Sequence, residues 1–262
     1  MSRTDLILWV ILPYVCATVF VVGHVWRYRR DQFTWTTRST QLLERKYLRL
    51  GSPLFHGGML AVFGGHAVGI LVPASLTEAL GVSEHQYHTM SVAMGTLTGT
   101  AMVTGFAILM VRRASVPRVR ATTSRVDVAT YVLLGTVMTI GMIETVGANL
   151  LGGGYDYRET VGPWFRGIFA FNPDAELMAG APLVYQAHAL AAWLLLALWP
   201  FSRLVHAWSV PVSYLRRSHI LYRRRGPAPV RAPKGPESVP AARPARVVRP
   251  VAPEVAHAVS DD

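Results

Sequence analysis

The chain has 262 residues, of which 51% are apolar and 16% charged, and its formal net charge is +11. The charges are segregated between long apolar stretches, which excludes an ordinary soluble domain and indicates an integral membrane protein. Nucleic-acid binding is another common reason for a basic chain, but no DNA- or RNA-binding motif accompanies the charge here.

Five stretches of about 20 largely apolar residues are each long enough to cross the ~30 Å hydrocarbon layer of a bilayer. The sequence therefore predicts an all-α integral membrane bundle of five transmembrane helices. The first stretch is too long for the apolar region of a secretory signal, and only Arg3 precedes it as a basic residue, so we expect a retained helix. The predicted spans cover residues 6–26, 54–74, 90–111, 128–148 and 183–204.

The basic residues fall almost entirely on one side of these predicted spans. Segments 27–49, 112–125 and 203–262 hold 23 of the 26 Lys and Arg residues. The positive-inside rule then places the N-terminus outside and the C-terminus in the cytoplasm of a cell-membrane protein. From residue 226 the chain is rich in Pro, Ala and Arg and has no apolar periodicity, which predicts a disordered cytoplasmic tail. Residues 1–225 form the predicted membrane domain and residues 226–262 the tail.

Four histidines lie in the second and fifth predicted spans or at their ends. LFHGGMLAVFGGHAVG (54–69) contains His56 and His66, and YQAHALAAWLLLALWPFSRLVHAW (185–208) contains His188 and His206. An ionisable group within a span is costly and usually faces a partner. Because the two spans run in opposite directions, His56 and His206 lie toward the cytoplasm, whereas His66 and His188 lie toward the outside. The sequence predicts two His–His pairs at two depths.

Paired imidazoles across a helix bundle are suited to the two axial positions of a haem iron, which then transfers electrons and has no vacant position for oxygen. Zinc is a weaker alternative, because these spacings do not bring ligands to one tetrahedral point. Several glycines near the histidines of the second span remove side chains that would keep a flat porphyrin from the backbone. They are Gly57, Gly58, Gly64, Gly65 and Gly69.

The spacing of the histidines constrains the helices. His56 and His66 are ten residues apart, a rise of ~15 Å, whereas His188 and His206 are eighteen residues apart, a rise of ~27 Å. Two straight, parallel helices do not bring both pairs level, so we expect a tilted helix, tilted haem planes or a bend at Pro200.

The chain resembles the gamma subunit family of membrane-bound respiratory nitrate reductase, a family of dihaem cytochromes b. The resemblance covers residues 6–225 and is carried by RYRRDQFTW (27–35), LFHGGMLAVFGGHAVG (54–69), PRVRATT (117–123) and PFSRLVHAWSVPVSYL (200–215). It implies that His56 and His206 hold a proximal haem b near the cytoplasm. It also implies that His66 and His188 hold a distal haem b near the outside.

The same resemblance implies a place in a quinol:nitrate oxidoreductase complex. A quinol, either menaquinol or ubiquinol, binds near the distal haem and gives up its electrons and protons. The electrons pass through the haems to an iron–sulfur beta subunit and then to a molybdenum-cofactor alpha subunit, where nitrate becomes nitrite. This chain has one cysteine and therefore no cysteine cluster, so it needs both partners for those steps.

The predicted quinol site departs from the family's pattern. The family places a lysine shortly after the second span, but the corresponding segment here reads SEHQYHTM (83–90) and has none. His85 or His88 is the replacement hydrogen-bonding group for the quinone oxygen, and an imidazole also accepts a proton near neutral pH. Gly65, beside His66, leaves room for the quinol head group. The alternative interpretation is that His85 and His88 are solvated loop residues.

Two other functions are compatible with the sequence alone. One is a dihaem membrane subunit of a related reductase, for heterodisulfide or sulfite, which the identity of the cytoplasmic partner distinguishes. The other is a haem-free transporter or membrane scaffold, which b-type absorbance of the purified chain would exclude. Glu144, near the outer end of the fourth predicted span, either reaches water or takes part in proton handling.

Overall fold

The computed structural model describes residues 2–209, and the regular structure of these residues is helical throughout. Within them, five helical segments are long and apolar enough to cross a membrane. The predicted all-α architecture with five spans is confirmed, while the side of the membrane on which each end lies stays a prediction. The tail predicted at residues 226–262 lies outside the described residues. The spans are Arg3–Arg30, Lys46–Leu71, Glu84–Ser115, Arg125–Leu150 and Leu183–Phe201.

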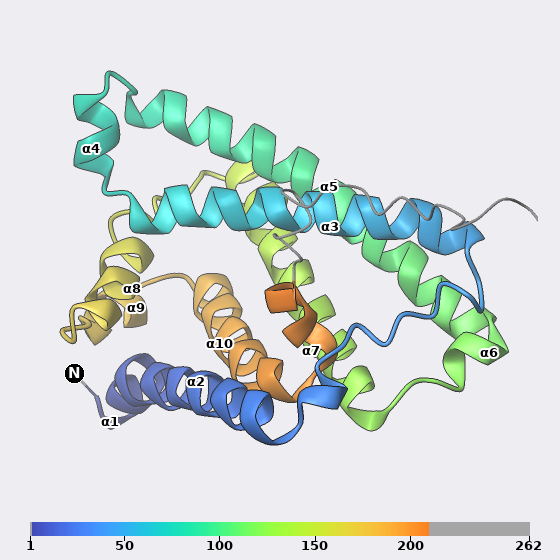
Figure 1. Cartoon of the computed structure of the whole chain (residues 1–262). Helices are drawn as coiled ribbons and strands as arrows, with labels where there is room; N and C mark the ends of the chain where they lie inside the picture. The colour runs from blue at the N-terminus through green and yellow to red at the C-terminus, as the bar shows by residue number, and fades with distance from the viewer. Residues whose placement is uncertain (1, 210–262) are drawn as a thin grey trace, which may run out of the picture. The chain divides into compact units, whose positions relative to one another are not determined.

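Four of the five spans combine α-helix with a short turn of another helical type (Figure 1). The spans are built from α1 (Arg3–Leu6), η1 (Ile7–Ile11) and α2 (Leu12–Arg30); α3 (Lys46–His66) and η3 (Ala67–Leu71); α5 (Glu84–Ser115); α7 (Arg125–Met142) and η4 (Ile143–Leu150); and α10 (Leu183–Leu198) with η5 (Trp199–Phe201). The connections contain η2 (Gln32–Thr34), α4 (Ala74–Ala79), α6 (Pro117–Arg120), α8 (Val161–Phe169) and α9 (Ala175–Ala179), and η6 (Arg203–Ser209) follows the fifth span.

Capping boxes fix where two of the long helices begin. The hydroxyls of Ser83 and Ser124 accept hydrogen bonds from the backbone N–H groups of Gln86 and Asp127. The side chains of Gln86 and Asp127 in turn accept from the N–H groups of the two serines. This reciprocal arrangement satisfies N–H groups that no helical carbonyl reaches. α5 therefore begins at Glu84 rather than at the predicted residue 90, and α7 begins at Arg125.

Glycines allow α3 and α5 to form the most extensive helix–helix contact of the described chain. A Cβ on Gly58 would lie 2.6 Å from the backbone nitrogen of Met102, and a Cβ on Gly105 would overlap the backbone of Phe55. Apolar lipid provides no hydrophobic drive between helices, so close backbone approach at small residues is a main source of packing energy. Gly58 was expected to make space for a porphyrin, but it serves helix packing instead.

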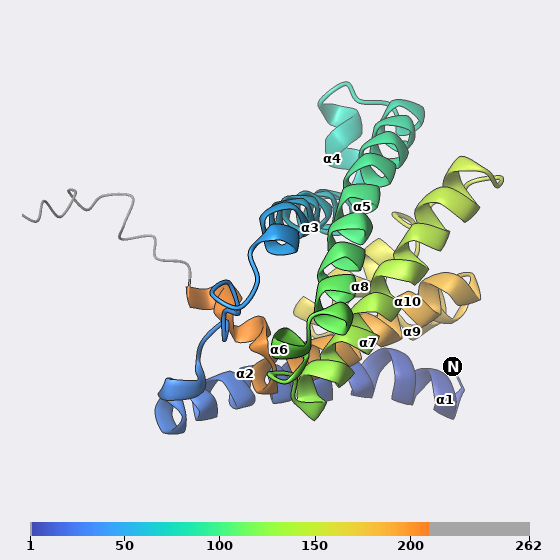
Figure 2. The same cartoon turned by 90° about the vertical axis from the view of Figure 1, so that its right-hand side faces the viewer.

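α10 belongs to a second group of helices, in which it packs against α2 and α7. Figures 1 and 2 both show α3 and α10 apart from each other, in different parts of the bundle. At the end of the bundle that contains α8 and α9, the indole N–H of Trp164 donates to the Trp9 carbonyl at 2.8 Å, and both rings are almost fully buried. This cluster ties the start of the first span to the segment between the fourth and fifth spans.

The fifth span breaks at Pro200, which is one of the three arrangements that the histidine spacing allowed. α10 ends at Leu198, Ser202 has extended backbone, and η6 continues as a separate helical turn. Proline lacks an N–H and its ring clashes with the preceding turn, which ends the regular helix. Gly23 on α2 makes room for the buried ring, because a Cβ there would lie 2.8 Å from the Cβ of Pro200. The last residues of the predicted span 183–204 lie beyond this break.

The buried guanidinium of Arg27 satisfies the carbonyls that the break releases. It donates to the carbonyl oxygens of Pro200 at 2.6 Å, Ser202 at 2.9 Å and Thr34 at 2.7 Å. A buried carbonyl without a partner is costly, particularly where lipid replaces water. Arg27, which the sequence presents as an ordinary positive-inside residue, therefore holds the end of the fifth span against the first.

We expect Gly58→Ala to destabilise the membrane domain by about 1–3 kcal/mol, because the added methyl meets helix backbone that does not yield. Gly135→Ala is the matched control, since a Cβ there would lie 3.4 Å from the Phe106 ring, an ordinary contact. Thermal unfolding of both variants in detergent, followed by gel filtration, provides the comparison. Equal Tm values would contradict the packing role assigned to Gly58.

Candidate functional site

The structure brings the four histidines together in the two pairs that their depths predicted. The ring centroids of His56 and His206 are 6.0 Å apart, with the ring planes at 70°. The centroids of His66 and His188 are 6.1 Å apart, with the planes at 18°. One member of each pair comes from α3, and the other comes from α10 or from η6 after it. Two separate sites of the same kind result.

Each pair joins helices that do not pack on one another. α3 packs mainly against α5, whereas α10 packs against α2 and α7. The imidazoles of the outer pair therefore come from two helices, α3 and α10, that Figures 1 and 2 show apart. Two metal–imidazole bonds of about 2 Å each, with the distance from each nitrogen to its ring centre, account for a centroid separation of this size. The rings fit two axial ligands on one iron.

The break at Pro200 removes the mismatch between the two spacings. His188 lies on α10, but His206 lies on η6, beyond the extended backbone at Ser202. His206 therefore does not lie on a continuation of the α10 axis. For this reason both pairs close, although eighteen helical residues would rise much further than ten.

Three of the four rings have their Nδ1 atoms bound to backbone carbonyls. Nδ1 of His56 lies 2.8 Å from the Ser52 oxygen, Nδ1 of His66 lies 2.8 Å from the Val62 oxygen, and Nδ1 of His206 lies 2.6 Å from the Arg203 oxygen. Because a carbonyl only accepts, each Nδ1 carries the proton and Nε2 keeps its lone pair. This is the tautomer that binds a metal through Nε2 and is fixed by the outer hydrogen bond.

His24 shows what an intramembrane histidine without such a role looks like. Its Nδ1 also lies near a backbone carbonyl, that of Phe20 at 2.7 Å. Its Nε2, however, accepts a hydrogen bond from the Trp208 indole at 3.0 Å, so the lone pair is already used. His24 is therefore a partly buried residue with a structural role.

His188 has a different environment from the other three. Its ring lies against Gly141 of α7, where a Cβ would be 3.0 Å from the Cε1 atom of the ring. Its Nδ1 is buried and has no hydrogen-bond partner among residues 2–209. The nearest carboxylate oxygen, Oε2 of Glu144, lies 3.9 Å away. Glu144 thus lies near a histidine of the outer pair, which the sequence did not predict.

The glycines of the second span fall into two classes. A Cβ on Gly57, Gly64 or Gly65 would meet no atom of the chain within 4 Å, which agrees with their predicted role of leaving space beside the histidines. Gly69, by contrast, lies against the hydroxyls of Tyr87 and Tyr157. The expectation that Gly69 makes space for a porphyrin is therefore wrong, as it was for Gly58. At both positions the missing side chain leaves room for another part of the protein.

A bidentate ion pair fixes the segment that carries His206. The Nε and Nη2 atoms of Arg203 donate to the two carboxylate oxygens of Asp127 at 2.6 and 2.7 Å. Burial lowers the pKa of the Arg203 guanidinium, but the hydrogen bonds and charge of Asp127 outweigh it and raise that pKa above its usual value. Arg203 also supplies the carbonyl that binds His206, so the start of η6 is tied to the start of α7.

The structure separates the residues predicted for the quinol site. His85 is exposed, while His88 is partly buried and its Nε2 lies 3.3 Å from the Asn149 side-chain oxygen. The Asn149 amide donates to the Glu144 carbonyl at 2.8 Å and to the Tyr185 hydroxyl at 2.7 Å. His88 is therefore part of a network beside the outer histidine pair, whereas Gly65 makes no contact with it that the structure records.

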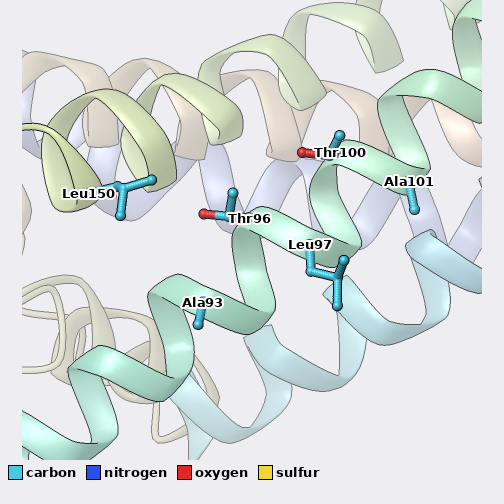
Figure 3. A pocket seen from close by; sticks show the side chains of 6 residues that line it. All are labelled: Ala93, Thr96, Leu97, Thr100, Ala101 and Leu150. Carbon is cyan, nitrogen blue, oxygen red and sulfur yellow. The ribbon is translucent and has the colours of Figure 1, made fainter.

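A groove between α5 and the end of η4 does not coincide with any predicted site residue. Its volume is about 560 Å³, and its lining is apolar apart from two threonine hydroxyls (Figure 3). The lining residues are Ala93, Thr96, Leu97, Thr100, Ala101 and Leu150. Leu97 is among the exposed apolar residues of the spans, so the groove belongs to the lateral surface of the bundle.

Comparison with known proteins identifies the family. The nitrate reductase gamma subunit family matches residues 5–225. The nitrate reductase gamma chain of Bacillus subtilis is 48% identical over 219 residues, which cover 84% of this chain and 98% of that protein. The respiratory nitrate reductase 1 gamma chain of Escherichia coli is 36% identical over 217 residues, covering 82% of this chain and 95% of that protein.

A longer relative matches over part of its length. The nitrate reductase-like protein NarX of Mycobacterium tuberculosis is 45% identical over 218 residues, which cover 83% of this chain and 33% of that protein. The matched region in all three relatives includes most of the five-span segment described above. The chain belongs to the nitrate reductase gamma subunit family.

Proposed function

We propose that this chain is the membrane electron-transfer subunit of a respiratory nitrate reductase and holds two b-type haems between its second and fifth spans. His56 and His206 are the proposed ligands of the proximal haem, and His66 and His188 those of the distal haem. The observation that carries the proposal is the pair of ring separations, 6.0 and 6.1 Å, between helices that do not pack on one another. Each haem, when bound, accepts and donates one electron at a time.

The chain contributes orientation and ligand strength to these sites. The carbonyls of Ser52, Val62 and Arg203 hold their partner rings with Nε2 free and draw the Nδ1 proton, which makes each imidazole a stronger donor. Gly57, Gly64 and Gly65 keep side chains away from the space beside the rings. Imidazole on both sides of an iron leaves no position for oxygen, so the sites transfer electrons.

His88 is the better of the two candidates for contact with the quinol head group. It is partly buried on α5 and hydrogen-bonded to Asn149, which in turn binds the Glu144 carbonyl next to the outer pair. His85 is exposed at the same end of α5. An imidazole in this position accepts the proton that a quinol hydroxyl releases on oxidation. Gly65 beside His66 leaves room for the head group.

The direction of transfer follows from the proposed orientation. Basic connections place the proximal pair near the cytoplasm and the distal pair near the outside. Quinol protons are then released outside while electrons move inward, so turnover generates a membrane potential. A gamma subunit of nitrate reductase works with alpha and beta subunits. We propose that the beta subunit receives the electrons on iron–sulfur clusters and that the alpha subunit uses them at its molybdenum cofactor.

Replacing the ligand histidines one at a time tests the haem assignment. His56→Ala or His206→Ala is expected to remove one b-type signal, and His66→Ala or His188→Ala the other, in redox difference spectra of the complex in membranes. His24→Ala is the matched control, because its Nε2 is occupied by Trp208, and it should keep both signals. The two-pair assignment would be refuted if His56→Ala and His66→Ala both removed the same haem signal.

Because Arg27 supports the segment that carries His206, its replacement is expected to weaken binding of the proximal haem only. Arg27→Ala leaves the carbonyls of Pro200 and Ser202 without their donor and releases the segment that carries His206. We expect the proximal haem signal to fall about tenfold while the distal signal persists, since second-sphere changes typically cost 10–100-fold in metal affinity. Arg29→Ala, an exposed position on the same helix, is the control and should have no effect. Equal loss of both haems would point to general misfolding.

Replacing the two quinol-site candidates, His88 and His85, is expected to have different effects on the rate at which quinol reduces the haems. His88→Ala is expected to slow haem reduction by added quinol about tenfold, because one hydrogen bond to the substrate is lost. His85→Ala should leave the rate unchanged, since His85 is exposed. Stopped-flow reduction of the haems by a menaquinol analogue measures both variants, and dithionite reduction checks that the haems are intact. A slow His85→Ala variant beside a normal His88→Ala variant would reverse the assignment.

A further inference from the structure

The side chains of His188 and Glu144, which lie close together at the outer histidine pair, each carry one buried polar atom without a partner. Oε2 of Glu144 is 3.9 Å from Nδ1 of His188, and the side chains are 13% and 18% exposed, respectively. Neither His188 Nδ1 nor the second Glu144 oxygen, Oε1, has a hydrogen-bond partner within the described residues. Buried polar atoms are nearly always paired, so two unpaired ones on facing side chains require an explanation.

The other three ligand histidines show what His188 lacks. Each of them binds a carbonyl of its own chain segment, three or four residues earlier, through Nδ1. A histidine that binds iron through Nε2 carries a proton on Nδ1, and this proton needs an acceptor. The carboxylate of Glu144 faces that proton, and a shift of about 1 Å brings the two atoms within hydrogen-bond distance. The backbone carbonyl of Val137 is a competing acceptor near the His188 ring.

The fourth span is shaped to hold the ring and the carboxylate together. Gly141 admits the His188 ring to the surface of α7, because a Cβ there would lie 3.0 Å from Cε1. Glu144 follows one turn later, where α7 gives way to the wider turn of η4. The Asn149 amide holds the Glu144 carbonyl at 2.8 Å and the Tyr185 hydroxyl at 2.7 Å. The backbone that carries the carboxylate is thereby fixed to the helix that carries the histidine.

We propose that Glu144 accepts the Nδ1 proton of His188 and so sets the orientation and electron donation of this imidazole toward the distal haem iron. The inference rests on the haem assignment proposed above. When it is ionised, the Glu144 carboxylate is a stronger acceptor than a carbonyl, so it would make His188 a stronger donor than the other proposed ligands. Stronger donation stabilises the oxidised iron and lowers the reduction potential of the distal haem. Glu144 is a positioning residue, since it acts through His188.

Glu144→Gln is the first test, made in the assembled complex in native membranes. The amide still fits and still accepts a hydrogen bond, but more weakly, so both haems are expected to remain. Potentiometric titration of the b-type absorbance should show the distal haem about tenfold more reduced at a fixed potential, a shift of ~59 mV for one electron. The proximal haem should not change. An unchanged distal potential overturns the inference and leaves the Val137 carbonyl as the partner of His188.

Glu144→Asp separates the hydrogen bond from the effect of charge alone. Aspartate keeps the negative charge but is one methylene shorter, so it withdraws from His188. If the hydrogen bond matters, Glu144→Asp raises the distal potential as Glu144→Gln does. If only the charge matters, Glu144→Asp retains the original potential, and the proposed contact is wrong. The EPR signal of the oxidised distal haem, which reports donation by its axial ligands, should shift in both variants.

Two further variants complete the test of the Glu144 contact, one that disturbs the His188 ring and one that serves as a control. Gly141→Ala pushes on the His188 ring without touching the carboxylate, and should alter the EPR signal of the same haem alone. Thr96→Val removes another buried, unpaired polar atom from a span and should leave both haems unchanged. A Gly141→Ala signal identical to that of the original protein would contradict the placement of His188 as a ligand of the distal haem against α7, on which the inference rests. If His188→Ala retains the distal haem signal, the ligand assignment fails, which is a different result from failure of the Glu144 contact.

Discussion

The two histidine pairs depend on the interruption of the fifth span at Pro200. A continuous helix would carry His206 far beyond the level of His56, because eighteen residues rise ~27 Å and ten rise ~15 Å. The interruption releases backbone carbonyls in a setting without water, and a membrane protein must satisfy them internally. The Arg27 guanidinium does so with bonds to Pro200 and Ser202. A cation from the first span therefore supports the segment in which His206 lies.

Glycine has two separate functions in the second span, and the local sequence does not distinguish them. Gly57 and Gly58 are neighbours, yet a Cβ on the first meets nothing within 4 Å and a Cβ on the second meets the backbone of α5 at 2.6 Å. Successive residues of a helix point about 100° apart, so Gly57 faces open space and Gly58 faces the packed neighbour. A side chain added at Gly58 therefore disturbs helix packing, whereas one added at Gly57 does not.

The sequence predicted features that depend on the chain's own pattern. Span number and pairing by depth follow from apolar length and from the antiparallel course of neighbouring spans, and the bend follows from Pro200. Contacts between residues that are far apart in the sequence were not predictable. Arg27 reads as a positive-inside residue, and its burial appears only when the carbonyls of the fifth span are in place. The assignment of His88 to a quinol remains a prediction, since no local pattern separates it from His85.

The two sites differ most in what lies behind their ligands. At the inner pair, His56 and His206 both meet backbone carbonyls, which are neutral acceptors. At the outer pair, His66 meets a carbonyl, but His188 faces the Glu144 carboxyl group. Under the proposal made above, a haem at the outer pair would hold an electron less tightly than one at the inner pair, because an ionised carboxylate favours the oxidised iron more than a carbonyl does. The proposed difference between the two histidine pairs would then direct electrons inward, and it would come from one acidic side chain.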